Sequence, residues 1–185
     1  MCNGISFLSA NGFRKTLPFT DAADTPKGFD RIPTGGGVYC LSVCHVGESV
    51  RGVLSKYRSS GLFRTLGKLN AASEAFFKSV GCGQEWGWGV DDERLARLDR
   101  IRFRKNGKLE CPILYFGRTK NLQTRMRQLL LLEHTVNHPF WALLNGGWKF
   151  SLSYRLVHDE KAAEARLKEN YRRAHRDMLP PLMDR

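Results

Sequence analysis

Arg125 lies at the border of an apolar helix face, a position that suits an arginine whose partner is an anion. Leu122, Met126, Leu129 and Leu130 recur at helical spacing and define that face. At about 100° per residue, Arg125 falls within about 60° of Leu122. A guanidinium at such a border is partly desolvated, so it needs a carboxylate or a phosphate as its partner. From these residues alone, an arginine that extends along the core edge to a surface carboxylate stays an open alternative.

The residues before this helix predict a strand, a turn and a helix start. Cys111 to Phe116 form a short apolar run that ends in an aromatic pair, which suits a buried strand. Gly117 can turn without the steric penalty of a Cβ atom, and Thr119 can cap the helix that follows. We therefore expect Tyr115 and Arg125 to be positioned by a strand and a helix that follow each other directly.

A second strand and a second helix are predicted near the end of the sequence. Residues 149–157 alternate apolar and polar side chains, the pattern of a half-buried strand. The apolar positions are Phe150, Leu152, Tyr154 and Leu156. Asp159 then predicts a helix N-cap, and Glu160 to Arg173 predict the helix itself.

Three glutamates of that helix, Glu160, Glu164 and Glu169, are candidates for a site carboxylate on its inward-facing side. The inward face of the helix is defined by Leu167, Tyr171 and Ala174. Glu164 lies about 20–60° from the first two of these, whereas Glu169 points away at about 140–160°. Glu160 is in angular register, but an acid in the first turn is explained by the helix dipole alone. Glu164 is therefore our choice, and its alternative is a surface pair with Lys168.

Together these segments resemble the signature of the GIY-YIG nuclease superfamily. The first tripeptide appears as Gly37-Val38-Tyr39. The second element runs without a gap from Tyr115 to Arg125: tyrosine, apolar, glycine, basic, small, two linkers, leucine, two linkers, arginine. In the third element a metal-binding glutamate is followed by an apolar residue three positions on and an aromatic or apolar residue seven positions on. Glu164, with leucine at 167 and tyrosine at 171, fits that element.

The resemblance implies a divalent-metal-dependent DNA endonuclease in which a water molecule attacks the phosphorus. It implies that Tyr39 is the general base or its relay and that Tyr115 orients the attacking water or the scissile phosphate. Arg125 would clamp the charge that develops on the phosphorane, and Glu164 would hold a single Mg²⁺ or Mn²⁺ ion. These residue types suit the chemistry, since a hard cation with one carboxylate and several waters is typical of phosphodiester sites. Tyrosine, with a pKa of about 10, needs neighbouring cations to act as a base at neutral pH.

The resemblance also implies an α+β fold of the mixed α/β class, a small and mainly antiparallel three-stranded sheet with helices around it. We expect one domain for the 185 residues, with residues 1–32 as an N-terminal arm. In this superfamily the two signature tyrosines usually lie on neighbouring strands of a hairpin, whereas Tyr39 and Tyr115 are 76 positions apart (115 − 39). Residues 44–108 are therefore expected to form a helical insertion.

The insertion is the candidate for target recognition, because restriction endonucleases of this superfamily carry insertions used in that way. Candidate helices are 49–58, 71–80 and 91–101, and a glycine- and tryptophan-rich loop covers 81–89. A glutamine on such a loop, Gln84, can reach a base edge. Arg102 and Arg104 are candidates for contacts with phosphates. The alternative is an insertion that only decorates the fold, with the tryptophans packed on the core.

The charge of the chain favours DNA as the partner. The net charge is +12 and the pI is about 9.8, which suits binding to a phosphate backbone through counterion release. Basic residues cluster in 94–108 and 161–176. Arg118 and Lys120, beside the second signature element, are further candidates for nucleic-acid contacts. A basic protein without such a partner is the alternative.

Two composition features concern the compartment. No uninterrupted apolar run approaches about 20 residues, so we expect no membrane span. The five cysteines form no dense framework, which favours reduced thiols and a cytoplasmic protein.

The chain departs from the superfamily pattern at two positions. Many members have histidine or tyrosine one turn after the arginine, but here that position is Leu129. His134 or His138 can substitute from the following loop, and His138 is a candidate for nucleic-acid contact. The superfamily's closing asparagine is also missing. These departures leave open a non-catalytic nucleic-acid-binding module, and a structure-selective repair or mobile-element nuclease stays open beside a site-specific restriction enzyme. A homodimer is compatible with each of these functions.

Overall fold

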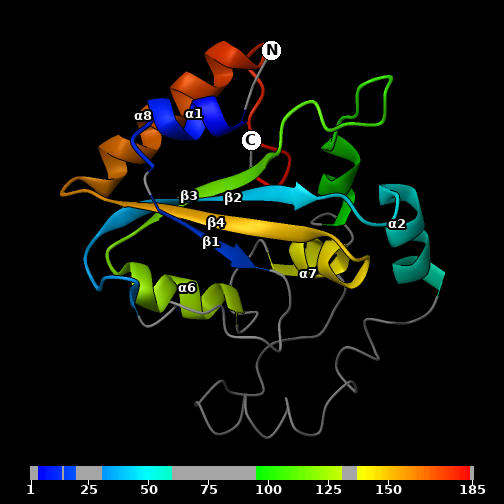
Figure 1. Ribbon diagram of the computed structural model, residues 1–185, viewed down its shortest axis with the longest axis horizontal. Coiled ribbons are helices and arrows are strands. Elements are labelled where there is room, and N and C mark those ends of the chain that lie inside the picture. Colours follow the sequence, from blue (N-terminus) through cyan, green and yellow to red (C-terminus); the bar gives the residue numbers. More distant parts are fainter. Residues whose placement is uncertain (1–3, 14, 20–30, 60–94, 131–136, 184–185) are drawn as a thin grey trace, which may run out of the picture.

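The computed structural model describes residues 4–13, 15–19, 31–59, 95–130 and 137–183 (Figure 1). Its elements in chain order are α1 (Gly4–Ala10), β1 (Lys15–Phe19), β2 (Gly37–His45), α2 (Val50–Ser59), η2 (Ala96–Arg100), β3 (Ile113–Thr119), α6 (Leu122–Leu130), α7 (Asn137–Asn145), β4 (Lys149–Leu156) and α8 (Glu160–Ala174). Helices surround an antiparallel sheet, so the expected mixed α/β class is confirmed.

The sheet contains four strands within the described residues, in the order β1-β4-β2-β3, and every pairing is antiparallel. The expected number of three was wrong because the N-terminal arm supplies β1. That strand pairs with β4, with Lys15 opposite Tyr154 and Phe19 opposite Phe150. It contains Pro18, which lacks an N–H group and is tolerated in a sheet mainly on an edge strand. The other edge strand is β3.

The strands that carry the two signature tyrosines are direct neighbours. β2 pairs with β3 from Gly37 opposite Thr119 to Ser42 opposite Ile113, with an irregularity after Leu41. The chain between them leaves the sheet at one end of β2 and returns at the same end of β3. The two tyrosines are therefore neighbours in space although they are 76 positions apart in the sequence.

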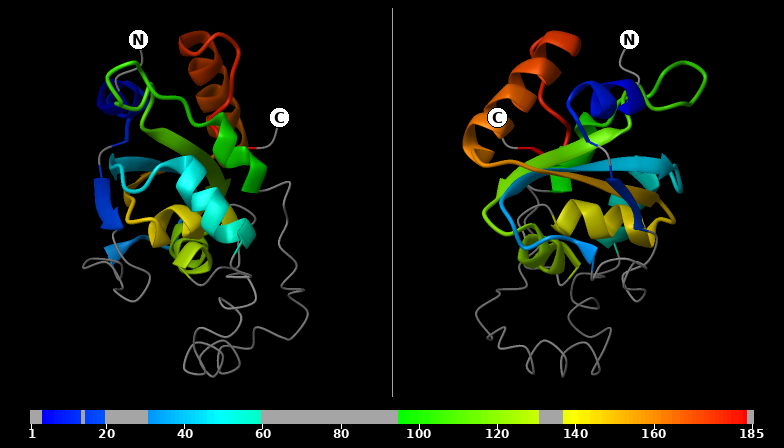
Figure 2. Two further views of the ribbon diagram at one scale, coloured as in Figure 1. Left: turned by 90° about the vertical axis from the view of Figure 1, so that its right-hand side faces the viewer. Right: turned by 60° about the vertical axis from the view of Figure 1, so that its left-hand side comes forward.

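Helices cover both faces of the sheet (Figures 1 and 2). On one face, α1 and α8 cover a core in which Val38 and Phe116 pack with Leu167 and Tyr171. On the opposite face lie α6 and α7. The core beneath them includes Tyr39, Leu41, Leu122, Leu129, Phe140, Trp148 and Phe150. The site described below lies where β3 ends and α6 begins, between the start of α8 and the start of α6.

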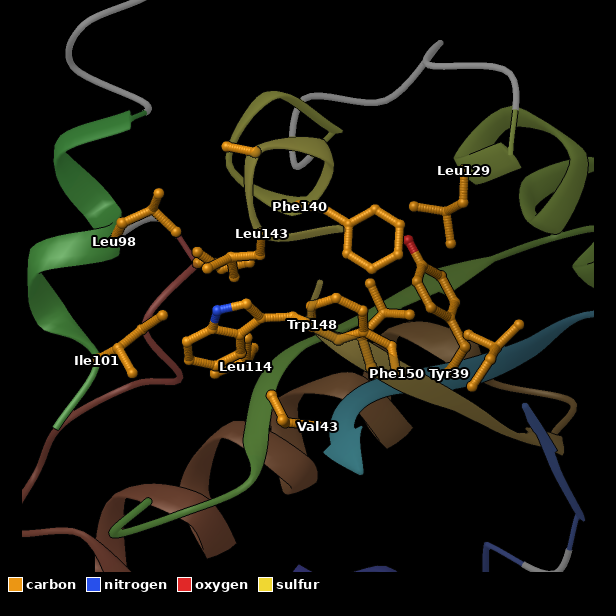
Figure 3. Close-up of a cluster of buried hydrophobic side chains, with 14 of the residues drawn as sticks. Tyr39, Val43, Leu98, Ile101, Leu114, Leu129, Phe140, Leu143, Trp148 and Phe150 are labelled. Carbon is orange, nitrogen blue, oxygen red and sulfur yellow. The ribbon is translucent and has the colours of Figure 1, made fainter. Parts of the chain in front are cut away.

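The buried Trp148 joins the sheet to the first helix of the insertion. Its indole Nε1 donates a hydrogen bond of 2.8 Å to the backbone oxygen of Glu48, just before α2. Figure 3 shows its ring between Leu143 and Leu114, with Leu98 and Ile101 at the side of the cluster. The start of the insertion is thus part of the core.

Only part of the insertion can be compared with expectation. The helix expected over 49–58 is confirmed as α2, and the described end of the helix expected over 91–101 is the 3₁₀ helix η2. The helix expected over 71–80 and the loop 81–89 with Gln84 lie outside the described residues. No helix in the described ranges has the length and apolar character needed to cross a bilayer.

Candidate functional site

Tyr39 and Tyr115 lie close together because Gly117 leaves room for both rings. Tyr39 is directly opposite Gly117 in the β2–β3 register. The ring centroids of the two tyrosines are 6.0 Å apart and their planes are inclined by 37°. A Cβ atom at position 117 would lie 2.7 Å from Oη of Tyr39 and 3.1 Å from Cε1 of Tyr115. The turn expected at Gly117 was wrong: the glycine is inside β3, and its missing side chain admits the tyrosines.

The first signature glycine also allows a close approach. A Cβ atom at Gly37 would lie 2.5 Å from the backbone oxygen of Arg155 and 2.6 Å from Cδ1 of Leu122. Leu122 is fully buried at the start of α6. Gly37 therefore lets α6 pack tightly against β2 at the point where the signature tyrosine follows.

Helix α6 starts at a different cap from the one expected. The side-chain oxygen Oδ1 of Asn121 accepts a hydrogen bond of 3.0 Å from the backbone N–H of Thr124, as an N-cap side chain does. Thr119 is instead the last residue of β3, and its hydroxyl donates a hydrogen bond of 3.0 Å to the backbone oxygen of Asn121. The prediction of Thr119 as the cap was wrong by two residues, because the strand continues through it.

Arg125 has the border position that the helical spacing predicts. Leu122, Met126 and Leu129 are buried on the same helix, while Arg125 is partly exposed. Its Nε atom is buried and has no hydrogen-bond partner among the described residues. Its charge is close enough to Tyr39 to oppose the rise in that residue's pKa. The side chain as a whole is partly exposed and lines the cleft described below, so its cationic group can receive an anionic ligand there.

Glu164 is positioned by the N-terminal half of α8. Asp159 caps this helix as expected, with Oδ1 accepting a hydrogen bond of 2.8 Å from the N–H of Ala162. The side chain of Glu164 is only 17% exposed. Its Oε2 lies 2.9 Å from Nε of Arg118 on β3, and its Oε1 lies 3.4 Å from Nζ of Lys168. The expected pair with Lys168 is thus present, but the contact of Glu164 with Arg118 on β3 is shorter.

The other two glutamates have different surroundings. Glu169 is 53% exposed and pairs with Arg173 at 2.8 Å, on the side of the helix away from the signature residues. Glu160 lines the same cleft as Glu164, one turn earlier. Glu164 and Glu160 are thus both carboxylates at the cleft, whereas Glu169 is not among its lining residues.

These side chains line one open cleft of about 610 Å³. Its lining residues are Tyr39, Tyr115, Gly117, Arg118, Thr119, Lys120, Asn121, Thr124, Arg125, Gln128, Glu160 and Glu164. Three of them are cationic and two are carboxylates. Asn121, Thr124 and Gln128 were not among the residues expected here, although their spacing of three and four places them on the face of α6 that carries Arg125. A cleft with this lining can hold a phosphate beside a carboxylate.

The surroundings of Tyr39 raise the pKa of its phenol well above the ordinary value. Burial is the largest cause, and the neighbouring Tyr115 adds to it by charge repulsion and by a side-chain hydrogen bond. The charge of Arg125 lowers the pKa, and that of Glu164 raises it slightly. At neutral pH Tyr39 is therefore a neutral phenol in this structure. In Figure 3 its hydroxyl points toward Leu129 and Phe140, which belong to the same buried cluster.

The remaining expected contact residues lie in different places. Arg118 and Lys120 line the cleft. Arg102 and Arg104 are exposed on the segment before β3, beyond the opposite end of that strand. His138 belongs to the first turn of α7, but its side chain lies outside the described part of the structure.

The carboxylates of the cleft suit a hard divalent cation only if the protein supplies few of its ligands. Within the described residues, no group of three or more histidine, cysteine, aspartate or glutamate side chains is arranged to hold a metal ion. Magnesium sites in phosphoryl chemistry commonly use one or two carboxylates, with waters and substrate phosphates completing the shell. Glu164, with Glu160 one turn away, supplies that donor set. A cation on Glu164 would replace the contacts that Arg118 and Lys168 make with it.

Comparisons of the chain with protein-family models, curated proteins and solved structures found no match.

Proposed function

We propose that this chain is a divalent-metal-dependent endonuclease of the GIY-YIG type that hydrolyses phosphodiester bonds in DNA. The observation that supports this most directly is the position of Arg125, a partly exposed cation that lines the same cleft as two tyrosines and two carboxylates. The net charge of +12 favours a polyanionic substrate. The four residues that follow the superfamily's order along the chain all line this cleft: Tyr39, Tyr115, Arg125 and Glu164.

In the proposed reaction a water oxygen forms a bond to phosphorus while the bond from phosphorus to the leaving sugar oxygen breaks. Arg125 donates hydrogen bonds to a non-bridging phosphate oxygen, where negative charge grows in the transition state. The hydroxyls of Tyr39 and Tyr115 orient the water. Tyr39 in its ionised form accepts the proton that the water loses, and the leaving sugar oxygen takes a proton from solvent water. Arg118 and Lys120, which also line the cleft, bind the flanking phosphates.

Glu164 is the residue proposed to hold Mg²⁺ or Mn²⁺, with Glu160 as the neighbouring carboxylate. The bound cation would supply positive charge beside the phosphate and the leaving oxygen. Positive charge near Tyr39 also lowers the pKa of its phenol. Tyr39 needs this lowering to act as a general base, because burial raises the pKa of its phenol when no cation is bound.

A non-catalytic nucleic-acid-binding module is the second candidate, and one observation favours it. Both oxygens of the Glu164 carboxylate contact cationic side chains, Arg118 and Lys168. Leu129 is also buried where many members of the superfamily have a polar residue. A protein that uses the cleft only to bind phosphates would keep Arg118, Lys120 and Arg125 but would not need Glu164.

Plasmid nicking separates the two candidates. Supercoiled plasmid is incubated with the purified protein and Mg²⁺ or Mn²⁺, with a chelator in parallel. The endonuclease converts the plasmid to open-circular or linear DNA only with the metal. The Arg125→Ala variant, purified identically, controls for a contaminating nuclease. Retention of the plasmid in gel shifts without any conversion would establish the binding module instead. Sequencing the ends cut from a random-sequence library then distinguishes site-specific restriction from structure-selective cleavage.

A further inference from the structure

Residues 101–110 form a compact hairpin immediately before β3. Phe103 and Leu109 are paired in an antiparallel bridge, and the backbone N–H of Arg104 donates a hydrogen bond of 2.8 Å to the oxygen of Lys108. Gly107 closes the turn with a φ of 75°, a left-handed conformation that suits glycine. The hairpin is thus ordered by its own backbone.

The base of the hairpin is attached to the core. The ring of Phe103 packs edge-on against the ring of Trp148, with centroids 6.2 Å apart. Ile101 is buried and Leu109 packs against the same core cluster. Since Trp148 is itself fully buried, the hairpin is held in a fixed orientation relative to the sheet.

The exposed part of the hairpin is strongly cationic, and Glu110 at its end is the one acidic residue of 101–110. Residues 102–108 are all exposed, and they contain Arg102, Arg104, Lys105 and Lys108 without an acidic residue. The guanidinium of Arg102 donates to the backbone oxygen of Asp99 at 2.6 Å, and that of Arg104 donates to the backbone oxygen of Glu110 at 3.4 Å. Backbone carbonyls orient these arginines but do not neutralise them. Four like charges held on one small turn favour a polyanion as the partner.

The hairpin and the cleft lie at opposite ends of one edge strand. Figure 1 shows the hairpin as the green loop that extends from the upper right, while β3 runs from it to the start of α6 on the left. Both views of Figure 2 show the same loop extending away from the sheet. At about 3.3 Å per residue, Leu109 and Gly117 are separated by at most about 26 Å. That distance corresponds to about 8 base pairs at about 3.4 Å each.

We propose that the hairpin 101–110 binds the backbone of a DNA duplex that lies along β3 and reaches the cleft, with Lys105 and Lys108 as its phosphate contacts. The path to the cleft rests on the function proposed above, whereas the contact between the hairpin and DNA does not. Such a contact adds affinity without sequence preference, because phosphates carry no base identity. The contact also orients the duplex along β3, with the cleft at one end of the strand and the hairpin at the other.

The test is the salt dependence of DNA binding, measured by fluorescence anisotropy with a labelled 24-base-pair duplex and a chelator present to prevent cleavage. Lys105→Gln/Lys108→Gln is compared with the wild type and with Arg51→Gln/Lys149→Gln. The control pair removes two exposed positive charges from α2 and β4, outside the two basic clusters of the sequence. Each lost phosphate contact lowers the slope of log K against log salt by about 1. We expect the lysine pair to lose about 2 units of slope and the control pair to change little. Thermal melts check that both variants fold.

The outcomes separate this proposal from the proposed function. An unchanged slope for the lysine pair, or an equal loss for the control pair, overturns the hairpin contact even if the protein nicks plasmid. A reduced slope in a protein that never nicks plasmid supports the hairpin contact and overturns the nuclease. With an active enzyme, the lysine pair should also need more DNA to reach the wild-type rate, while the rate at saturation stays the same. This is the behaviour of a contact made equally in the ground state and in the transition state.

Discussion

Arg118 and Glu164 form an ion pair across the candidate cleft, with 2.9 Å between Nε and Oε2, although 46 residues separate them in sequence. Arg118 comes from the edge strand β3 and Glu164 from α8. The pair therefore connects the proposed phosphate-binding side of the cleft with the proposed metal ligand. A divalent cation that binds Glu164 has to compete with this guanidinium.

The first prediction concerns that competition. Arg118→Gln should tighten Mn²⁺ binding in the absence of DNA by about 1.4- to 5-fold, since an exposed ion pair contributes about 0.2–1 kcal/mol. Electron paramagnetic resonance of free Mn²⁺ measures the affinity. Arg173→Gln is the matched control, because it breaks the Arg173–Glu169 pair of 2.8 Å on the same helix. Equal Mn²⁺ affinity for the wild type and Arg118→Gln would show that the guanidinium of Arg118 does not compete with the ion for Glu164.

The second prediction concerns Gly117. Gly117→Ala should lower the free energy of unfolding by about 1–3 kcal/mol, the usual cost of overpacking. The reason is that the new Cβ would lie 2.7 Å from Oη of Tyr39. Adding Tyr39→Phe to this variant removes that oxygen and should restore part of the loss. Urea unfolding of the two single variants and the double variant measures the coupling, and purely additive changes would contradict it.

The third prediction concerns the alkaline stability. Burial, with smaller contributions from Tyr115 and Glu164, raises the pKa of Tyr39 in the folded state above its unfolded value of about 10. This contribution to stability is complete below about pH 10 and is lost as the pH rises toward the folded pKa. The loss is about 1.4 kcal/mol per pH unit. Tyr39→Phe should remove that part of the pH dependence in urea unfolding at pH 9, 10 and 11. Parallel curves for the wild type and the variant would contradict the raised pKa.

The fourth prediction separates catalysis from packing at Arg125. Arg125→Ala should reduce the cleavage rate by at least about 100-fold, as expected for a donor aimed at developing charge. The free energy of unfolding should change by no more than about 1 kcal/mol, because Nε has no partner among the described residues. Single-turnover cleavage and thermal melts measure the two effects. An Arg125→Ala variant that unfolds easily but cleaves normally when folded would establish a core-edge role.

Periodic segments of the sequence predicted their elements closely. The alternation over 149–157 became β4 (Lys149–Leu156), although Leu156 is 54% exposed at its end. The cap at Asp159 and the start of α8 were also right, because the cap and the apolar spacing are both local signals.

The errors have physical causes outside the local sequence. Gly117 suggested a turn because glycine favours turns, but the need for its missing Cβ comes from Tyr39, which is 78 residues away (117 − 39). Strand β1 was missed because Pro18 weakens a strand pattern, and only its edge position in the sheet makes the proline acceptable. The pairing of Arg118 with Glu164 depends on how α8 lies against β3, so no spacing in the sequence reports it.

The most direct test of the central claim compares two glutamates of one helix. Glu164→Gln and Glu169→Gln are each assayed for single-turnover DNA cleavage with Mg²⁺ and for DNA binding. Glu164 lines the cleft, whereas Glu169 pairs with Arg173 on the exposed side of α8. We predict that Glu164→Gln cleaves at least about 100-fold more slowly while its affinity for DNA is nearly unchanged, and that Glu169→Gln cleaves like the wild type. Wild-type cleavage by Glu164→Gln, together with an inactive Glu169→Gln or Glu160→Gln, would contradict the assignment.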